Sequence, residues 1–162
     1  MIYEEGTPEQ IFEHPQREKT RAFVMQLKTL SFSVSPSDGI SSGMVQQLEE
    51  FGRTVMLEPV MLRHLMLATE ELLSQIITHA HKQNAADHPI RVYIEHSEIE
   101  NDLILDISFE GEQFDPIGSG DELSLMIVKH VTSELNCSFT GEKEIPINHI
   151  HAVIRRPVQH LK

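Results

Sequence analysis

The stretch RVYIEHSEIENDLILDISF, residues 91–109, decides the fold. Apolar and polar side chains alternate over 91–96 and again over 101–109. In the second run, one face carries Leu103, Leu105, Ile107 and Phe109. Because successive side chains of a strand point to opposite faces of a sheet, this alternation predicts two strands with one buried face each. The short turn between the runs predicts that the two strands form an antiparallel hairpin.

Helical patterns surround this hairpin. Residues 44–51 and 59 to about 82 carry apolar side chains at a period of 3.6 residues, and Pro59 suits a first helical turn. The longer helix is apolar on most sides and is expected to be buried. A third helix is expected from about 122 to 133, followed by strands in LNCSFTG (135–141) and IPINHIHAVI (145–154). This order predicts an α+β two-layer sandwich, a mainly antiparallel sheet with helices on one face.

Composition excludes several classes of function. The chain has 162 residues, with 13 Lys and Arg against 25 Asp and Glu, and a formal net charge of -12. Such an acidic surface repels phosphate backbones and anionic membranes, so nucleic acid and lipid headgroups are poor partners, and we expect neither nucleic-acid binding nor membrane insertion. The single cysteine, Cys137, is expected to fill the core and fits a reducing compartment. No apolar run is long enough to insert into a membrane, and we expect a cytoplasmic protein.

Three polar residues of the long helix share one face, because Glu71, Gln75 and His79 are spaced four residues apart. From spacing alone, they are a polar edge on a buried helix. However, EELLSQIITHA (70–80) resembles the N-box of the Bergerat-fold ATPases, which include histidine kinases, and most closely that of the anti-sigma-factor serine kinases. The resemblance implies a histidine-kinase-like ATPase fold. In it Glu71 stands where the family polarises the attacking group, and Gln75 replaces the magnesium-binding Asn.

The resemblance continues into the hairpin and the next helix, over about residues 40–157. LILDISFEGEQFDP (103–116) resembles the family's D-x-G-x-G-F-D-P motif, and Gly111 keeps the first glycine. Phe109 replaces the adenine-binding Asp, and Gln113 replaces the second glycine. ELSLMIVKHV (122–131) resembles a glycine-rich helix start, with Glu122 and Ser124 at the glycine positions.

These departures imply a degenerate nucleotide site. A phenyl ring accepts no hydrogen bond from adenine, and side chains at glycine positions obstruct the backbone N–H groups that bind phosphate. We therefore expect no catalytic residue, with Glu71 as the remnant of a base, no metal site, and no cofactor. ATP-Mg is the cofactor if the site is still competent. The remnant pocket consists of Glu71, Gln75, His79, Phe109, Gly111, Gln113 and Ser124.

The start of the chain resembles a different family. EEGTPEQIFEHPQREKTRAF (4–23) is similar to the last segment of the ATP-hydrolysing subunit of polar amino-acid ABC transporters. We expect short helices at 8–13 and 15–30, with LSFSV (30–34) as a candidate short strand. The expected division is an ABC-type tail at 1–32, a linker at 33–43 rich in Ser, Gly and Pro, and the ATPase-like domain at 44–162. No Walker A motif is present.

Three functions follow. The favoured one is an accessory, regulatory domain of an ABC transporter ATP-binding protein in amino-acid transport. Its partners are the ATPase body or the membrane subunits, through which the protein is membrane-associated, or a second copy in a homodimer. The second is an ATP-dependent anti-sigma-factor-type serine kinase. The third is a small-ligand sensor that uses the repurposed pocket.

His149 and His151 share a strand face, but no carboxylate lies at a metal-ligand spacing from them. Five methionines are expected to fill the core: Met44, Met56, Met61, Met66 and Met126.

Overall fold

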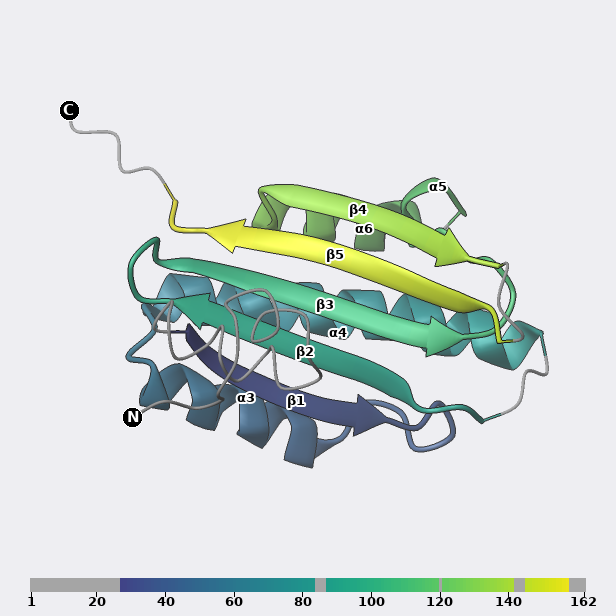
Figure 1. Ribbon diagram of the computed structural model, residues 1–162, viewed down its shortest axis with the longest axis horizontal. Coiled ribbons are helices and arrows are strands. Elements are labelled where there is room, and N and C mark those ends of the chain that lie inside the picture. Colours follow the sequence, from purple (N-terminus) through teal and green to yellow (C-terminus); the bar gives the residue numbers. More distant parts are fainter. Residues whose placement is uncertain (1–26, 84–86, 120, 142–144, 158–162) are drawn as a thin grey trace, which may run out of the picture.

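The computed structural model describes residues 27–83, 87–119, 121–141 and 145–157. In that part of the chain, five strands form one sheet (Figure 1). The strands are β1 (Leu27–Val34), β2 (Ile90–Ser97), β3 (Asp102–Glu110), β4 (Glu134–Thr140) and β5 (Ile147–Arg155). Their order is β1-β2-β3-β5-β4, and every neighbouring pair is antiparallel.

The hairpin of β2 and β3 lies at the centre of this sheet and confirms the expectation from residues 91–109. Leu105 lies opposite Ile94 in the register. Asn101, whose φ of 55° is left-handed, closes the turn with a hydrogen bond of 2.8 Å from its N–H to the carbonyl of Ser97. Asn tolerates this conformation better than most residues, which explains why the turn occurs here.

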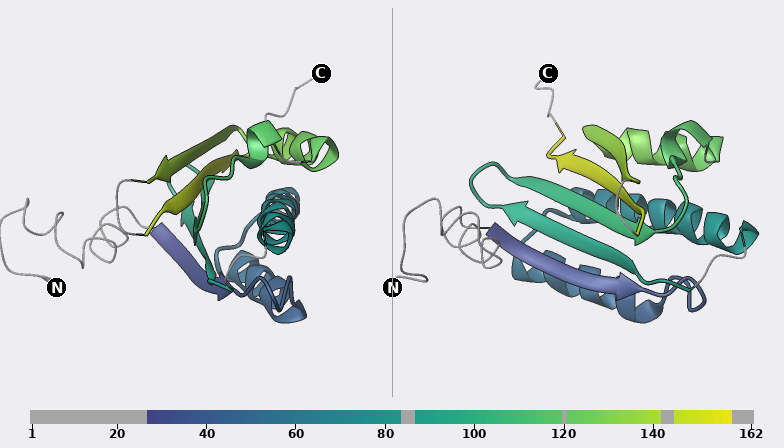
Figure 2. Two further views of the ribbon diagram at one scale, coloured as in Figure 1. Left: turned by 90° about the vertical axis from the view of Figure 1, so that its right-hand side faces the viewer. Right: turned by 45° about the vertical axis from the view of Figure 1, so that its right-hand side comes forward.

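In the described ranges, four helices lie on one face of the sheet (Figure 2). They are α3 (Ser42–Thr54), α4 (Pro59–Lys82), α5 (Pro116–Ser119) and α6 (Glu122–Val131). Their apolar side chains meet those of the sheet in one core, which includes Leu48, Leu65, Leu73, Ile94, Leu105 and Ile150. We call the face under the helices the covered face, and the opposite one, on which no described helix lies, the open face. The two-layer α+β sandwich is confirmed.

The first strand corrects one expectation. The helix expected over 15–30 is wrong at Leu27–Leu30, where the chain is already in β1, and the rest of that helix lies outside the described residues, as does the helix expected at 8–13. Residues 27–34 pair with β2 along their full length. The alternation of LKTLSFSV suits this edge position, because it turns Val34 to the core and Ser33 to solvent. The sheet thus reaches into the expected linker, and α3 begins at Ser42.

Smaller differences concern the helices. α5 is a short helix inside the expected loop, and α6 ends at Val131, two residues before the expected end. Met44 and Met61 are buried as expected, whereas the core role expected of Met56 and Met126 is wrong, because their exposed fractions are 85% and 68%. Among the described residues, none of the helices combines the length and apolar character that crossing a lipid bilayer requires.

Candidate functional site

The polar face of α4 meets the start of α6. Ser124 Oγ donates a hydrogen bond of 2.7 Å to Glu71 Oε2, and the backbone N–H of Asp121 donates one of 2.9 Å to Gln75 Oε1. The Asp121 carboxylate caps α6 by accepting from the N–H of Ser124 at 3.0 Å. Three of the predicted site residues, Glu71, Gln75 and Ser124, therefore form one network, in which the oxygens of α4 hold the first turn of α6.

The third residue of the α4 face holds the loop before α5. The imidazole of His79 stacks on the ring of Phe114, with centroids 4.1 Å apart and an interplanar angle of 9°. The same loop contains Gly111, whose φ of 133° favours glycine, and Gln113, which is exposed. His79 and Gly111 thus both belong to the site region, where they contribute to the position of the loop.

Asn148 of β5 is a site residue that the sequence reasoning missed. Its side chain is buried, its Oδ1 accepts from the N–H of Phe114 at 2.9 Å, and its Nδ2 donates to the carbonyl of Glu112 at 2.9 Å. In the register Asn148 lies opposite Phe109, on the covered face. The available signal was a polar residue at an apolar position in the alternation of INHIHAVIR.

Phe109 lies on the covered face, in phase with the apolar side chains before it on β3, as the sequence predicts. Its exposed fraction is 7%, and it belongs to the core. Five of the seven predicted site residues are therefore in the core or in contacts that join α4 to α6 and to the loop before α5. Of the other two, Gly111 is hydrogen-bonded to Pro146 and Asn148, and Gln113 is exposed.

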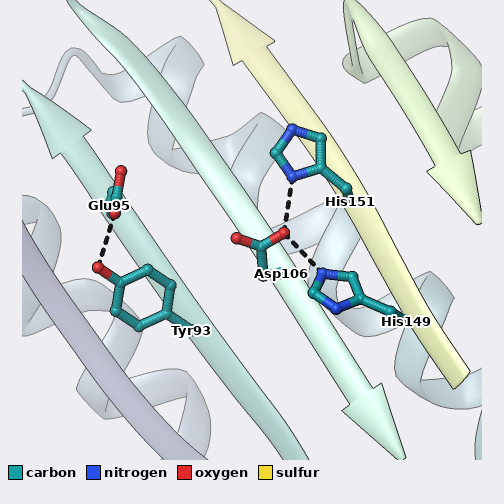
Figure 3. A network of polar contacts seen from close by, with 5 residues as sticks. All are labelled: Tyr93, Glu95, Asp106, His149 and His151. Atoms are coloured by element: carbon teal, nitrogen blue, oxygen red, sulfur yellow. Dashed lines mark hydrogen bonds and ion pairs between the residues drawn. The ribbon is translucent and has the colours of Figure 1, made fainter. Parts of the chain in front are cut away.

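A second polar cluster lies on the open face (Figure 3). Asp106 Oδ1 of β3 accepts hydrogen bonds from His149 Nε2 at 3.1 Å and from His151 Nδ1 at 2.7 Å, both on β5. On β2, Tyr93 donates its hydroxyl to Glu95 at 2.7 Å. The sequence indicated that the two histidines share a face, but it missed the carboxylate between them, because Asp106 is brought there by strand pairing.

The open-face cluster borders a cavity of about 760 Å³, whose lining includes Arg91, Ser108 and His149. Although two imidazoles and a carboxylate lie together there, no group of three His, Cys, Asp or Glu side chains is arranged to hold a metal ion within the described residues. The cluster is a hydrogen-bonded network.

Two side chains near the helices have shifted pKa values. Burial, followed by the carboxylate of Asp115 and its hydrogen bond, raises the pKa of the half-buried Cys137 thiol to about 12. Partial burial lowers the pKa of His64 on α4, with smaller effects from His130 of α6 and from Arg63. The second shift indicates that positive groups of α4 and α6 lie near each other at the C-terminal end of α6.

Comparison with known proteins gives a fold and no family. No family model matches the chain, and no curated protein matches it significantly. A solved structure does match, the crystal structure of the SiaB-SiaC complex from Pseudomonas aeruginosa. The likeness covers 87% of this chain and 98% of the matched chain, with a TM-score of 0.64 and 15% sequence identity. At this identity the likeness establishes a shared fold.

Proposed function

We propose that this chain is a regulatory domain that acts by binding another protein, on a kinase-type fold whose nucleotide site is closed. The observation that carries the proposal is the pairing of Glu71 and Gln75 with the first turn of α6. In the kinases that the sequence resembles, these two positions serve the reacting group and the magnesium. Here their oxygens accept from Ser124 and Asp121 of the same chain.

Two further features support a closed site. Phe109 fills core volume at the position that the resemblance gives to adenine recognition. At the glycine-like positions, Gln113 and Ser124 carry side chains that obstruct close approach of a phosphate to the backbone. The residues present therefore do not fit ATP-Mg.

The likeness to a chain of a two-protein complex supports a protein partner for this fold. The finer interpretation, in which the partner is an ABC transporter ATPase or its membrane subunits, depends on residues 1–30 alone. Those residues lie mostly outside the described part of the chain, and no comparison supports that interpretation. It stays a prediction, as does the small-ligand sensor.

The second candidate is an anti-sigma-factor-type serine kinase. One observation favours it: Glu71 and Gln75 share one face of α4, and what occupies them is a pair of single hydrogen bonds. The bond to the neutral amide of Gln75 contributes about 0.5–1.5 kcal/mol and the bond to the Glu71 carboxylate about 1.5–3 kcal/mol, so a tightly bound nucleotide is able to displace them. In this candidate Glu71 is the base, and the contacts with α6 are those of a resting state.

Isothermal titration of the full chain with ATP-Mg separates the two candidates. The closed-site proposal expects no binding heat and no rise in melting temperature with millimolar ATP-Mg. Binding together with phosphate transfer to a protein, lost in Glu71→Gln, would establish the kinase and overturn the proposal.

A genetic experiment tests the regulatory role itself. In the native organism, the phenotype of deleting this chain is compared with that of Glu71→Gln, which keeps the size of the side chain and the capacity to accept from Ser124. If the chain acts by contact, Glu71→Gln behaves as wild type. A Glu71→Gln strain as defective as the deletion contradicts the proposal.

A further inference from the structure

α6 carries a second apolar stripe, on the side that faces away from the core. Leu123 and Met126 are 65% and 68% exposed, and the less exposed Ile127 lies on the same side of the helix. Positions i, i+3, i+4 and i+7 lie on one side of a helix. The core side of the same helix carries Val128 and Val131, which are buried. A surface helix needs only one such stripe to pack on its own domain.

The position of α6 explains why this stripe is open. α6 lies at one edge of the helix layer, with α4 beside it, whereas α4 lies between α3 and α6 (Figure 2). The other strongly exposed large apolar side chains of the described residues lie in loops and turns: Ile40, Met56, Ile99 and Ile145. α6 is thus the described helix on which two such side chains stand one turn apart.

The charges beside the stripe are opposite at its two ends. Asp121 and Glu122 are acidic at the N-terminal end, and Lys129 and His130 are basic at the C-terminal end. Within the described part of the chain, Glu122 and Lys129 have no ion-pair partner. Glu122 and Lys129 are seven residues apart, so they flank the stripe on the same side, about two turns from each other.

The apolar stripe and its two flanking charges are complementary to a second copy of α6 that runs in the opposite direction. We propose that the exposed face of α6 is a self-association surface, on which a second copy of the chain packs its own α6 in the antiparallel direction. In a two-fold contact the stripe meets the same stripe, and each Glu122 lies near Lys129 of the other copy. A parallel pair would place like charges together. Antiparallel packing also brings opposite ends of the two helix dipoles together.

The short length of α6 limits the strength of the contact. The helix has 10 residues, so a helix pair buries less than the area of about 1,200 Å² that is typical of stable complexes. We therefore expect a reversible dimer that dissociates in the micromolar range. The inference is independent of whether the α4–α6 site binds nucleotide, because no side chain of the stripe takes part in the hydrogen bonds of Ser124 with Glu71 and of Asp121 with Gln75.

Sedimentation equilibrium of the full chain, over a series from low micromolar to millimolar concentration, tests the surface. Met126→Glu places a charge in the stripe and should weaken the dimer by roughly tenfold or more, since the charge must lose water on association. The matched control is Ile99→Glu, an equally exposed apolar residue in the β2–β3 turn at 70%, which should leave association unchanged. A wild-type chain that stays monomeric, or a dimer insensitive to Met126→Glu, overturns the proposal.

A charge exchange tests the antiparallel direction. Glu122→Lys alone and Lys129→Glu alone should each weaken the dimer, because each places like charges opposite one another in both halves of the contact. The double variant restores opposite charges between the copies and should recover association. Both changes are unfavourable with respect to the dipole of their own helix, because they place a positive charge at its N-terminus and a negative charge at its C-terminus. A more stable helix therefore cannot explain the recovered association. A double variant that associates no better than the single ones overturns the antiparallel arrangement, and circular dichroism of each variant verifies the fold.

Discussion

The two faces of the sheet use the same strands for opposite purposes. On β3, Leu105 and Ile107 face the helices and are fully buried. Asp106 and Ser108 alternate with them along the strand and face the open side. On the open face polar groups are the rule. On the covered face they are exceptions, and the exception Asn148 joins the sheet to the loop of the candidate site. A polar residue among apolar neighbours is therefore a stronger sign of a specific structural contact than a polar residue on a polar face.

The largest expected effect separates the two faces within one strand. Leu105→Ala leaves a cavity in the centre of the core and should lower the free energy of unfolding by about 2–5 kcal/mol. Ser108→Ala, on the open face of the same strand, should change it by about 0.5 kcal/mol or less. Urea denaturation monitored by circular dichroism measures both. Similar losses in the two variants would contradict the division into a covered and an open face.

The covered face was largely predictable from the sequence because its signals are local. The alternation over 101–109 predicted which side of β3 is buried, and Pro59 marked the start of α4 at the residue where the structure has it. The periodicity of apolar side chains and the residues at helix ends are properties of residues close together in the sequence. These local properties determine where the helices and strands form. The contacts of Glu71 and Gln75 with α6 could not be predicted in this way. Their spacing showed that they share a face of α4, but it did not show which residues that face contacts.

What could not be predicted is long-range. Asp106 and His151 are 45 residues apart and meet because β3 and β5 pair in one register. A shift of one residue would turn His151 to the covered face, so no local pattern predicts this contact. The exposed Met126 belongs to the same class, because a helical stripe does not say which element covers it. Similarly, residues 27–30 suit a helix or a strand until β2 is present.

The next effect concerns Asn148, one of the polar exceptions on the covered face. Asn148→Ala removes the acceptor of the Phe114 N–H and the donor to Glu112. Leaving these groups unpaired should cost about 1–3 kcal/mol and speed amide exchange at Phe114. The matched control is Asn136→Ala on β4, which is exposed and should have little effect on either quantity. Unchanged exchange at Phe114 would mean that Asn148 does not hold the loop.

The last expected effect concerns thiol reactivity and compares neighbours on β4. Cys137 lies on the covered face with its pKa raised to about 12, and Ser138 is exposed. The thiolate is the reactive form, so Cys137 should react with iodoacetamide at pH 8 roughly fifty-fold more slowly than the thiol of a Ser138→Cys, Cys137→Ser variant.

The pH dependence of the two alkylation rates tests whether the difference in reactivity comes from the thiol pKa values. As pH rises, the rate for Ser138→Cys should level off near the ordinary thiol pKa of about 8.5, whereas the rate for Cys137 should keep rising beyond it. Asp115→Asn should speed Cys137 only in part, because burial is the larger cause of its pKa shift. If both thiols level off at the same pH, then the covered face at β4 is as open to water as the face behind it, and the two faces differ only where α4 lies.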